Sequence, residues 1–258
     1  MKWKRVIAEG ISEGLFFIKG HQNYQKGLRI LLYHSIDAKL PHDSYGISVK
    51  KEVFTRQMAA LRGMEDICIV SLNNRHVSDT ALQIAITFDD GYKDNLYTAA
   101  PILLKYRIPF TVFVSTAFIQ KKVPFYLTPQ ELKELSSVDG VTIGSHGVNH
   151  IPLAECGDSA LWKELRESKN YLEDITGKPI TAVSYPYGSV NRRVRDTAAK
   201  AGYIIGGCSM FGINKASRDA LLLYRTEMIA SDSEKVFLQK LYGAWDWYKW
   251  GQKALTAI

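Results

Sequence analysis

The sequence predicts a single α/β domain built on a parallel sheet, and three observations support this. Short apolar runs alternate with helical segments from residue 84 onward, which gives about seven strand–helix units. No proline- or glycine-rich linker and no internal repeat divides the chain. A length of 258 residues suits one domain of this class. Such units either close into a barrel or stay an open sheet, and in both cases catalytic residues gather at the carboxyl ends of the strands.

The first elements follow from apolar spacing. Ile7, Ile11, Leu15 and Ile18 recur at intervals of four and three, which predicts an amphipathic helix with Glu9, Ser12 and Glu13 away from this face. Residues 28–33 form an apolar run that predicts a buried strand. Residues 53–62 predict a helix with Phe54, Met58 and Leu61 inward.

The later elements alternate. Strands are predicted over residues 84–88, 110–114, 141–144, 180–185, 203–208 and 221–224. Helices are predicted over residues 95–106, from Thr128 onward, over 161–175 and 191–201, and from 233 to about 250. Thr128-Pro129-Gln130-Glu131 is typical of a capped helix start, and Gly177 of a helix end.

Composition narrows the class of protein. The chain is 46% hydrophobic and 23% charged, as ordinary globular proteins are. Its three cysteines are odd in number and far apart, which excludes a disulfide framework and a CxxC zinc site. No signal peptide is evident, since Glu9 and Glu13 interrupt the apolar stretch one would need, and no window reaches the length of a spanning helix. We therefore expect a cytoplasmic protein.

The formal charge of +7 is concentrated at the start of the chain. Residues 1–29 hold six Lys and Arg against two Glu. There is no nucleic-acid-binding motif, so we expect no nucleic-acid partner and favour an anionic lipid or glycan. Aromatic and basic residues also gather near both ends: Trp3, Tyr242, Trp245, Trp247, Tyr248, Lys249, Trp250 and Lys253. Either the terminal helices pack on the domain, or they make peripheral contact with the inner face of an anionic membrane.

Two segments at predicted strand ends carry metal-binding residue types. Asp89 and Asp90 close the strand 84–88, where unpaired carboxylates would be costly to bury. His146 and His150 follow the strand 141–144, and a spacing of four places two imidazoles one helical turn apart on one face. Two His and one Asp leave an open ligand position, as catalytic metal sites do. A turn in place of the Asp pair is the simpler alternative.

Two further strand ends carry candidate residues. Tyr185-Pro186-Tyr187-Gly188 predicts a tight turn, which either serves only as a turn or directs a backbone N–H at a developing oxyanion. His34 ends the strand 28–33. A lone His at such a position is either structural or, given the neighbouring strand ends, a general acid.

These motifs resemble the polysaccharide deacetylase family, that of the NodB homology domain (carbohydrate esterase family 4). The resemblance rests on residues 87–91, 145–150 and 185–188 and covers residues 28–230. It implies a distorted (β/α)7 barrel over residues 28–230, with an amphipathic helical segment over 1–27 and an aromatic-rich helix over 231–258. It also implies Asp89 as general base and a divalent metal on Asp90, His146 and His150. Zinc is expected, with Ni²⁺, Co²⁺ or Mn²⁺ as alternatives.

The chain departs from the common family pattern in two places. Ser184-Tyr185 stands where many members have an arginine, and no histidine follows His150. In this respect the chain resembles the permuted branch that acts on poly-N-acetylglucosamine-type polymers. The permuted branch implies His34 as the general acid and Arg225 as the partner of the base Asp89, while the family as a whole implies the Tyr187 N–H as an oxyanion donor.

The function expected from this resemblance is hydrolysis of an N-acetyl group on an amino-sugar glycan or its precursor. Alternatives are a deacetylase or deformylase of a lipid- or nucleotide-linked sugar, a non-catalytic carbohydrate-binding relative, and an interaction protein whose metal is structural. Three visible protein ligands argue against a closed structural site.

Overall fold

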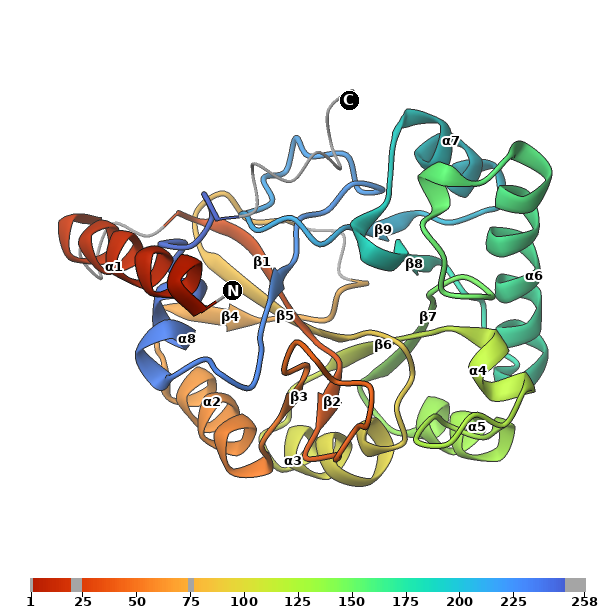
Figure 1. Cartoon of the computed structure of the whole chain (residues 1–258), viewed down its shortest axis with the longest axis horizontal. Helices are drawn as coiled ribbons and strands as arrows, with labels where there is room; N and C mark the ends of the chain where they lie inside the picture. Colours follow the sequence, from red (N-terminus) through yellow and green to blue (C-terminus); the bar gives the residue numbers. More distant parts are fainter. Residues whose placement is uncertain (1, 20–24, 74–76, 249–258) are drawn as a thin grey trace.

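The computed structural model describes residues 2–19, 25–73 and 77–248, and Figure 1 shows the arrangement of their elements. The helices are α1 (Lys2–Lys19), α2 (Lys51–Gly63), a π-helical turn (Asn95–Ala99) leading into α3 (Ala100–Lys105), α4 (Thr116–Gln120), α5 (Pro129–Ser137), α6 (Asp158–Thr176), α7 (Arg192–Lys200) and α8 (Glu234–Leu241). The strands of the main sheet are β1 (Gly27–Tyr33), β4 (Ile67–Ile69), β5 (Leu82–Phe88), β6 (Phe110–Val114), β7 (Val141–Ser145), β8 (Ala182–Ser184), β9 (Ile205–Gly207) and β10 (Thr226–Glu227). The strands β2 (Ser35–Ile36) and β3 (Ser48–Val49) pair separately.

The main sheet is parallel and curves almost into a closed barrel. Its order is β10-β1-β5-β6-β7-β8-β9, with β4 paired to the first half of β5 beside this path. Residues 223–227 join the two edges, because Leu223 bridges Gly207 at the end of β9 while Thr226 pairs with Leu31 of β1. The seven strands along this path, surrounded by helices, confirm the predicted single-domain, distorted (β/α)7 barrel.

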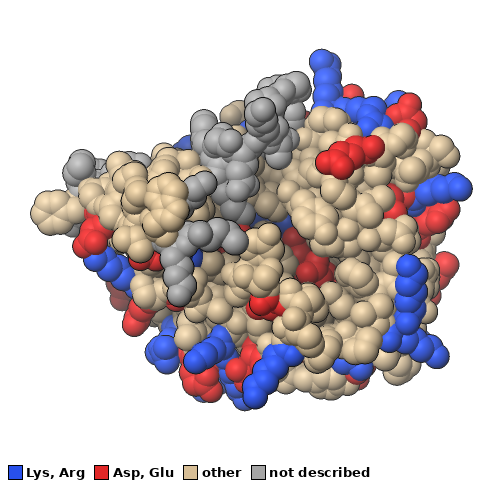
Figure 2. Space-filling view, viewed as in Figure 1, with Lys and Arg blue, Asp and Glu red and all other residues tan. Residues whose placement is uncertain are grey.

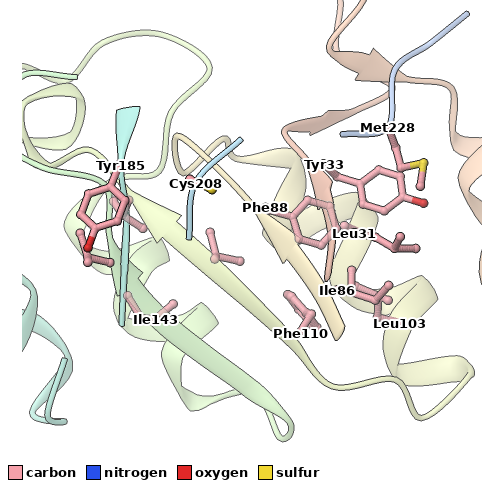
Figure 3. Packing of buried hydrophobic residues seen from close by; sticks show 14 of the residues in the cluster. Leu31, Tyr33, Ile86, Phe88, Leu103, Phe110, Ile143, Tyr185, Cys208 and Met228 are labelled. Atoms are coloured by element: carbon pink, nitrogen blue, oxygen red, sulfur yellow. The ribbon is translucent and has the colours of Figure 1, made fainter. Parts of the chain in front are cut away.

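Two apolar layers lie on the two sides of this sheet. Leu28, Ile30, Ala85, Phe113, Ala182, Ile205 and Leu223 pack together inside the barrel. The alternate strand residues face the helices, and Figure 3 shows part of this outer layer, with Tyr33, Phe88 and Phe110 from three neighbouring strands. The Phe88 ring lies 5.7 Å from that of Tyr33 and 5.8 Å from that of Phe110. The layer fixes the strand register, because a slip of one residue would exchange the two faces.

The same alternation determines what reaches the interior at the carboxyl ends of the strands. Counting in steps of two from Ile30, Ala85 and Ala182 leads to His34, Asp89 and Ser184. The step from Leu223 leads to Arg225. The barrel therefore collects these polar side chains at one end of its interior, in spite of their distance along the chain.

The predicted bounds of one strand and one helix are wrong. The strand predicted over residues 221–224 is only bridged at Leu223, and the paired strand β10 lies two residues beyond that range, because Leu222 closes a turn by bonding to the Asp219 carbonyl. The last helix ends at Leu241 instead of near residue 250, since the chain turns at Tyr242 and Gly243. Among the described residues, no helix combines the length and apolar character that a bilayer span requires.

The predicted helix at the start of the chain is present as α1, but its apolar face is oriented differently. Ala8 and Ser12 are buried, whereas Ile7 and Ile11 are exposed. In the C-terminal aromatic group, Trp245 is buried and Tyr242 is partly buried, so part of that group packs on the domain. Trp3, Trp247 and Tyr248 are exposed. Lys249, Trp250 and Lys253 lie outside the described residues.

Candidate active site

Asp89 and Arg225 form a buried ion pair at the carboxyl end of the barrel. The Arg225 guanidinium donates from Nη1 to Asp89 Oδ1 and from Nη2 to Asp89 Oδ2, both at 2.7 Å. Arg225 Nε also donates to the Cys208 carbonyl at 3.0 Å. A side chain at position 207 would lie 2.7 Å from Arg225 Nε, so this approach requires Gly207. The structure therefore brings Arg225 and Asp89 into direct contact.

The electrostatic effect of this pair keeps Asp89 ionised. Burial by itself would raise the pKa of Asp89, but the charge of Arg225 and its hydrogen bonds outweigh burial and the pKa is lowered. Ser184 adds a third contact, since its hydroxyl lies 2.9 Å from Asp89 Oδ2 and 2.7 Å from Arg225 Nη2. A carboxylate held in this way is an acceptor with a fixed orientation.

Asp90, His146 and His150 converge beside this pair. One ligand atom from each lies within 4.8 Å of the others. His150 Nε2 is 3.2 Å and His146 Nε2 is 3.5 Å from Asp90 Oδ1. Asp90 Oδ1 is nevertheless buried and has no properly aligned hydrogen bond to any residue that the structure describes. Two ligand atoms about 2.0–2.1 Å from a tetrahedral ion lie about 3.3 Å apart, so the three side chains fit a shared divalent cation.

His146 is oriented as a metal ligand. Its Nδ1 lies 2.8 Å from the Ser184 carbonyl, so Nδ1 carries the proton and the lone pair is on Nε2, the atom that faces Asp90. Burial lowers the pKa of His146 to about 4, which keeps the imidazole neutral at neutral pH. Burial would raise the pKa of Asp90, but the contact with His150 and the other imidazoles lower it.

His146 and His150 lie in a loop and not on one face of a helix, so the predicted helical turn between them is wrong. Residues 146–150 have no helical turn, and Gly147 and His150 have φ of +74° and +54°. Asp90 likewise has φ of +76°, a conformation rare for residues other than glycine. Backbone strain of this kind is typical of functional sites, where the surrounding structure holds it.

Glu164 of α6 holds the loop between the two histidines. Its Oε2 accepts from the N–H groups of Val148 and Asn149 at 2.8 and 3.0 Å, and its Oε1 accepts from Asn149 Nδ2 at 2.7 Å. The side chain is buried, with an exposed fraction of 4%. Sequence reasoning missed this residue. The available signal was an acidic residue within the buried face of Leu161, Leu165 and Leu172.

His34 lies near both aspartates. It follows Tyr33, whose carbonyl accepts from the Asp89 N–H at 2.9 Å, and the charge of His34 contributes to lowering the pKa of Asp89 and of Asp90. Its Nδ1 is buried and has no hydrogen-bond partner among the described residues. The imidazole is thus available at the site on the side of β1.

The residues of the turn after β8 differ in their exposure to solvent. Tyr185 and Pro186 are buried, and Tyr185 donates its hydroxyl hydrogen to the Leu221 carbonyl at 2.9 Å, so both support the barrel. Tyr187 has φ of +58°, and 66% of it is exposed. Its ring lies 4.7 Å from that of His150, which places Tyr187 at the rim of the site. Gly188 has φ of +68° and completes the turn.

Phe118 joins His150 to a buried aromatic cluster. Phe118 lies 5.9 Å from the His150 ring and 4.2 Å from Tyr126, which stacks on Tyr92. His42 contacts the Tyr92 hydroxyl at 3.0 Å. Figure 2 shows that acidic atoms line a hollow near the middle of the face seen in Figure 1. Tyr92 and Tyr126 are buried, so they support the site from behind.

Sequence reasoning gave Ser184 only as a departure from the family pattern. The structure places its hydroxyl between Asp89 and Arg225 and its carbonyl against His146. Ser184 therefore links the ion pair to the candidate metal ligands. Its place two residues after the inward Ala182 was the signal that could have identified it.

Comparison with known proteins places this geometry in a family. The family model for Polysaccharide deacetylase matches residues 77–205, which is half of the chain. The Bacillus subtilis protein YxkH, whose name places it among the polysaccharide deacetylases, is 28% identical over 218 residues, covering 81% of this chain and 74% of that protein.

Two further relatives extend the comparison. The poly-beta-1,6-N-acetyl-D-glucosamine N-deacetylase of Staphylococcus aureus is 29% identical over 133 residues, which cover 47% of this chain and only 46% of that enzyme. The structure of the Streptococcus pyogenes deacetylase PplD, solved with acetate, matches with a TM-score of 0.73 and 27% identity, covering 84% of this chain and 99% of that one. The chain belongs to the polysaccharide deacetylase family and is accordingly a hydrolase of carbon–nitrogen bonds other than peptide bonds.

Proposed function

We propose that the protein is a metal-dependent N-deacetylase of an amino-sugar glycan, with Asp89 as the general base. The observation that carries the proposal is the position of Asp89: ionised, held by Arg225, and 3.8 Å from Nε2 of the candidate ligand His146. A base fixed beside a metal site is the arrangement that hydrolysis of an unactivated amide requires.

Asp90, His146 and His150 would hold the ion. A divalent cation there, Zn²⁺ on ligand chemistry, supplies Lewis acidity and lowers the pKa of water toward neutrality. Residues of the protein itself transfer the protons and stabilise the oxyanion. Asp89 accepts the proton of the attacking water, and the Tyr187 N–H stabilises the oxyanion of the tetrahedral intermediate.

The leaving nitrogen needs a proton, because an amide nitrogen does not depart as an anion. His34 is the candidate donor, since it lies at the end of β1 beside the ion pair and its Nδ1 has no partner among the described residues. In this scheme His34 protonates the amine as the carbon–nitrogen bond breaks. The products are acetate and a free amino sugar.

For the substrate we propose a β-linked N-acetylglucosamine polymer or its lipid- or nucleotide-linked precursor. The name of the Staphylococcus aureus relative supports the N-acetylglucosamine unit. The ring of Tyr187, exposed at the rim of the site beside His150, supports contact with a sugar ring. Release of acetate from oligomeric, lipid-linked and nucleotide-linked N-acetylglucosamine would distinguish the three forms.

The decisive experiment is the variant Asp89→Asn. Asparagine cannot accept the proton, so we expect kcat for acetate release from N-acetylglucosamine oligomers to fall by about 10²–10⁴-fold, with zinc still bound at one ion per chain. The control is Asp158→Asn, a carboxylate on α6 that is 89% exposed, with kcat unchanged. Most of the rate surviving in a zinc-loaded Asp89→Asn protein would refute the proposed base. Acetate release that is insensitive to chelators would refute the metal dependence.

A further inference from the structure

The helix α1 has two faces of opposite environment. Its inner face packs Ala8, Leu15 and Phe16 against a cluster of Phe211, Val236, Ala244 and Trp245. Arg5 bonds to Asp232 at 2.9 Å and Lys235 pairs with Glu13, which attaches the helix to the segment around α8. Figure 1 shows α1 at one end of the molecule beside α8. The helix is therefore fixed on the domain.

The opposite side, which we name the outer face, consists of Trp3, Val6, Ile7, Gly10, Ile11, Gly14 and Phe17. The five large side chains among them are exposed by 64%, 67%, 52%, 46% and 88%. At about 100° per residue these positions fall within an arc of about 140°, and no charged residue shares that arc. A stripe of this width normally faces a protein core, whereas here it faces outward.

The helix α1 carries a net positive charge. Both acidic residues of α1 are paired, Glu9 with Arg5 at 2.9 Å and Glu13 with Lys235. Over residues 2–19 four Lys and Arg stand against these two Glu, which leaves a net charge of +2. A positive apolar surface complements an anionic lipid surface, while it opposes a second copy of itself, since two such faces would bring like charges together.

Two exposed aromatic side chains lie beside α1, next to its inner side. The Trp247 indole donates to Ser12 Oγ of α1 at 3.3 Å, and Trp247 and Tyr248 are each 37% exposed. Trp and Tyr are favoured where hydrocarbon meets lipid headgroups. Exposed aromatic residues beside an apolar helix face are the pattern of an interfacial helix.

We propose that the outer face of α1 binds an anionic lipid bilayer, with the helix lying in the plane of the headgroups. The buried inner face, anchored by Arg5 and Glu13, keeps the domain attached while the outer side chains enter the acyl boundary. In the view of Figure 2 the helix borders the face that holds the acidic hollow. Docking there would hold the hollow near the membrane surface.

The test is co-sedimentation of the full chain with vesicles of phosphatidylglycerol and phosphatidylcholine, compared with phosphatidylcholine alone. We expect pelleting with the anionic vesicles that weakens as salt is raised. The triple variant Ile7→Gln, Ile11→Gln, Phe17→Gln should lower the partition coefficient by about tenfold or more, because about two buried methylene groups correspond to a factor of ten.

The matched control carries three glutamines at exposed apolar positions on other parts of the surface: Leu104, Trp162 and Ile204. It should bind anionic vesicles within about twofold of the unmodified chain. Circular dichroism and the melting temperature establish that both triple variants fold, and neither measurement depends on the deacetylase activity.

Three results would overturn the proposal. The first is no pelleting of the unmodified chain, and the second is equal pelleting of the α1 variant. The third is light scattering that shows a dimer which the α1 variant dissociates, with no binding to vesicles, since the occupant of the outer face would then be a second copy.

Discussion

Replacing Arg225 by methionine would test how the barrel controls its base. Arg225 is fully buried and makes four hydrogen bonds, two of them to Asp89. Removing one member of a buried pair leaves the other charge uncompensated and costs about 3–5 kcal/mol. We therefore expect the free energy of unfolding at pH 7 to fall by about that amount.

The loss should depend on pH in a defined direction. In the unmodified chain the pKa of Asp89 is lowered, so the pair stabilises the fold above the ordinary pKa of an aspartate and this contribution is lost as pH falls through the folded-state value. In the variant, burial acts without Arg225 and the pKa of Asp89 is raised above its ordinary value. The fold then loses stability as pH rises through that value, so the difference between the proteins is largest at neutral pH and shrinks in acid.

Two assays follow from this reasoning. Urea unfolding at pH 4 to 8 measures the stability difference, and the pH dependence of kcat/KM measures the ionised fraction of Asp89, whose acid limb should move to higher pH. Arg195→Met, at a partly exposed arginine paired with Asp219, is the control and should change stability by less than about 0.5 kcal/mol. An Arg225→Met protein with an unmoved acid limb and a stability loss independent of pH would refute the argument.

Two other residues give predictions of the same kind. Glu164→Ala removes the acceptor of three N–H groups between His146 and His150, and we expect zinc affinity, measured by competition with a chelator, to fall about 10- to 100-fold; unchanged affinity would mean that the loop holds itself. Asp94 accepts from Ser35 and from the Ile36 N–H, yet burial raises its pKa to about 6, so its ionised form destabilises the fold. Asp94→Asn should therefore raise the free energy of unfolding at pH 8 by up to about 3 kcal/mol, with the gain vanishing below about pH 4, and a gain that does not depend on pH would contradict this cause.

The sequence predicts those features correctly that are determined by residues close together in the chain. Asp89 and His146 could be predicted to lie close together because each directly follows a buried strand, and parallel strands place their carboxyl ends together. The start of α5 was found because Thr128 and Glu131 cap each other reciprocally, at 3.2 and 2.7 Å. The information needed for these predictions lies within a few residues.

The predictions that were wrong concern features that depend on contacts between residues far apart in the sequence. Closure of the barrel depends on residues 223–227 meeting both β9 and β1, and no local pattern encodes a single bridge at Leu223. The histidine pair shows the same limit. Its spacing of four suggested a helix, but the positive φ of Gly147 and the bonds to Glu164 create an equivalent distance in a loop.

The orientation of α1 shows why periodicity alone cannot distinguish a core helix from an interfacial one. Its apolar stripe gives the same pattern whether it faces protein or lipid, since both are apolar surroundings. The orientation of α1 on the domain is determined by the opposite side of the helix. Ala8 and Ser12 are small enough to let α1 lie close against the cluster around Trp245, and Arg5 fixes the rotation by pairing with Asp232. With that side committed to the domain, Ile7, Ile11 and Phe17 can only face outward.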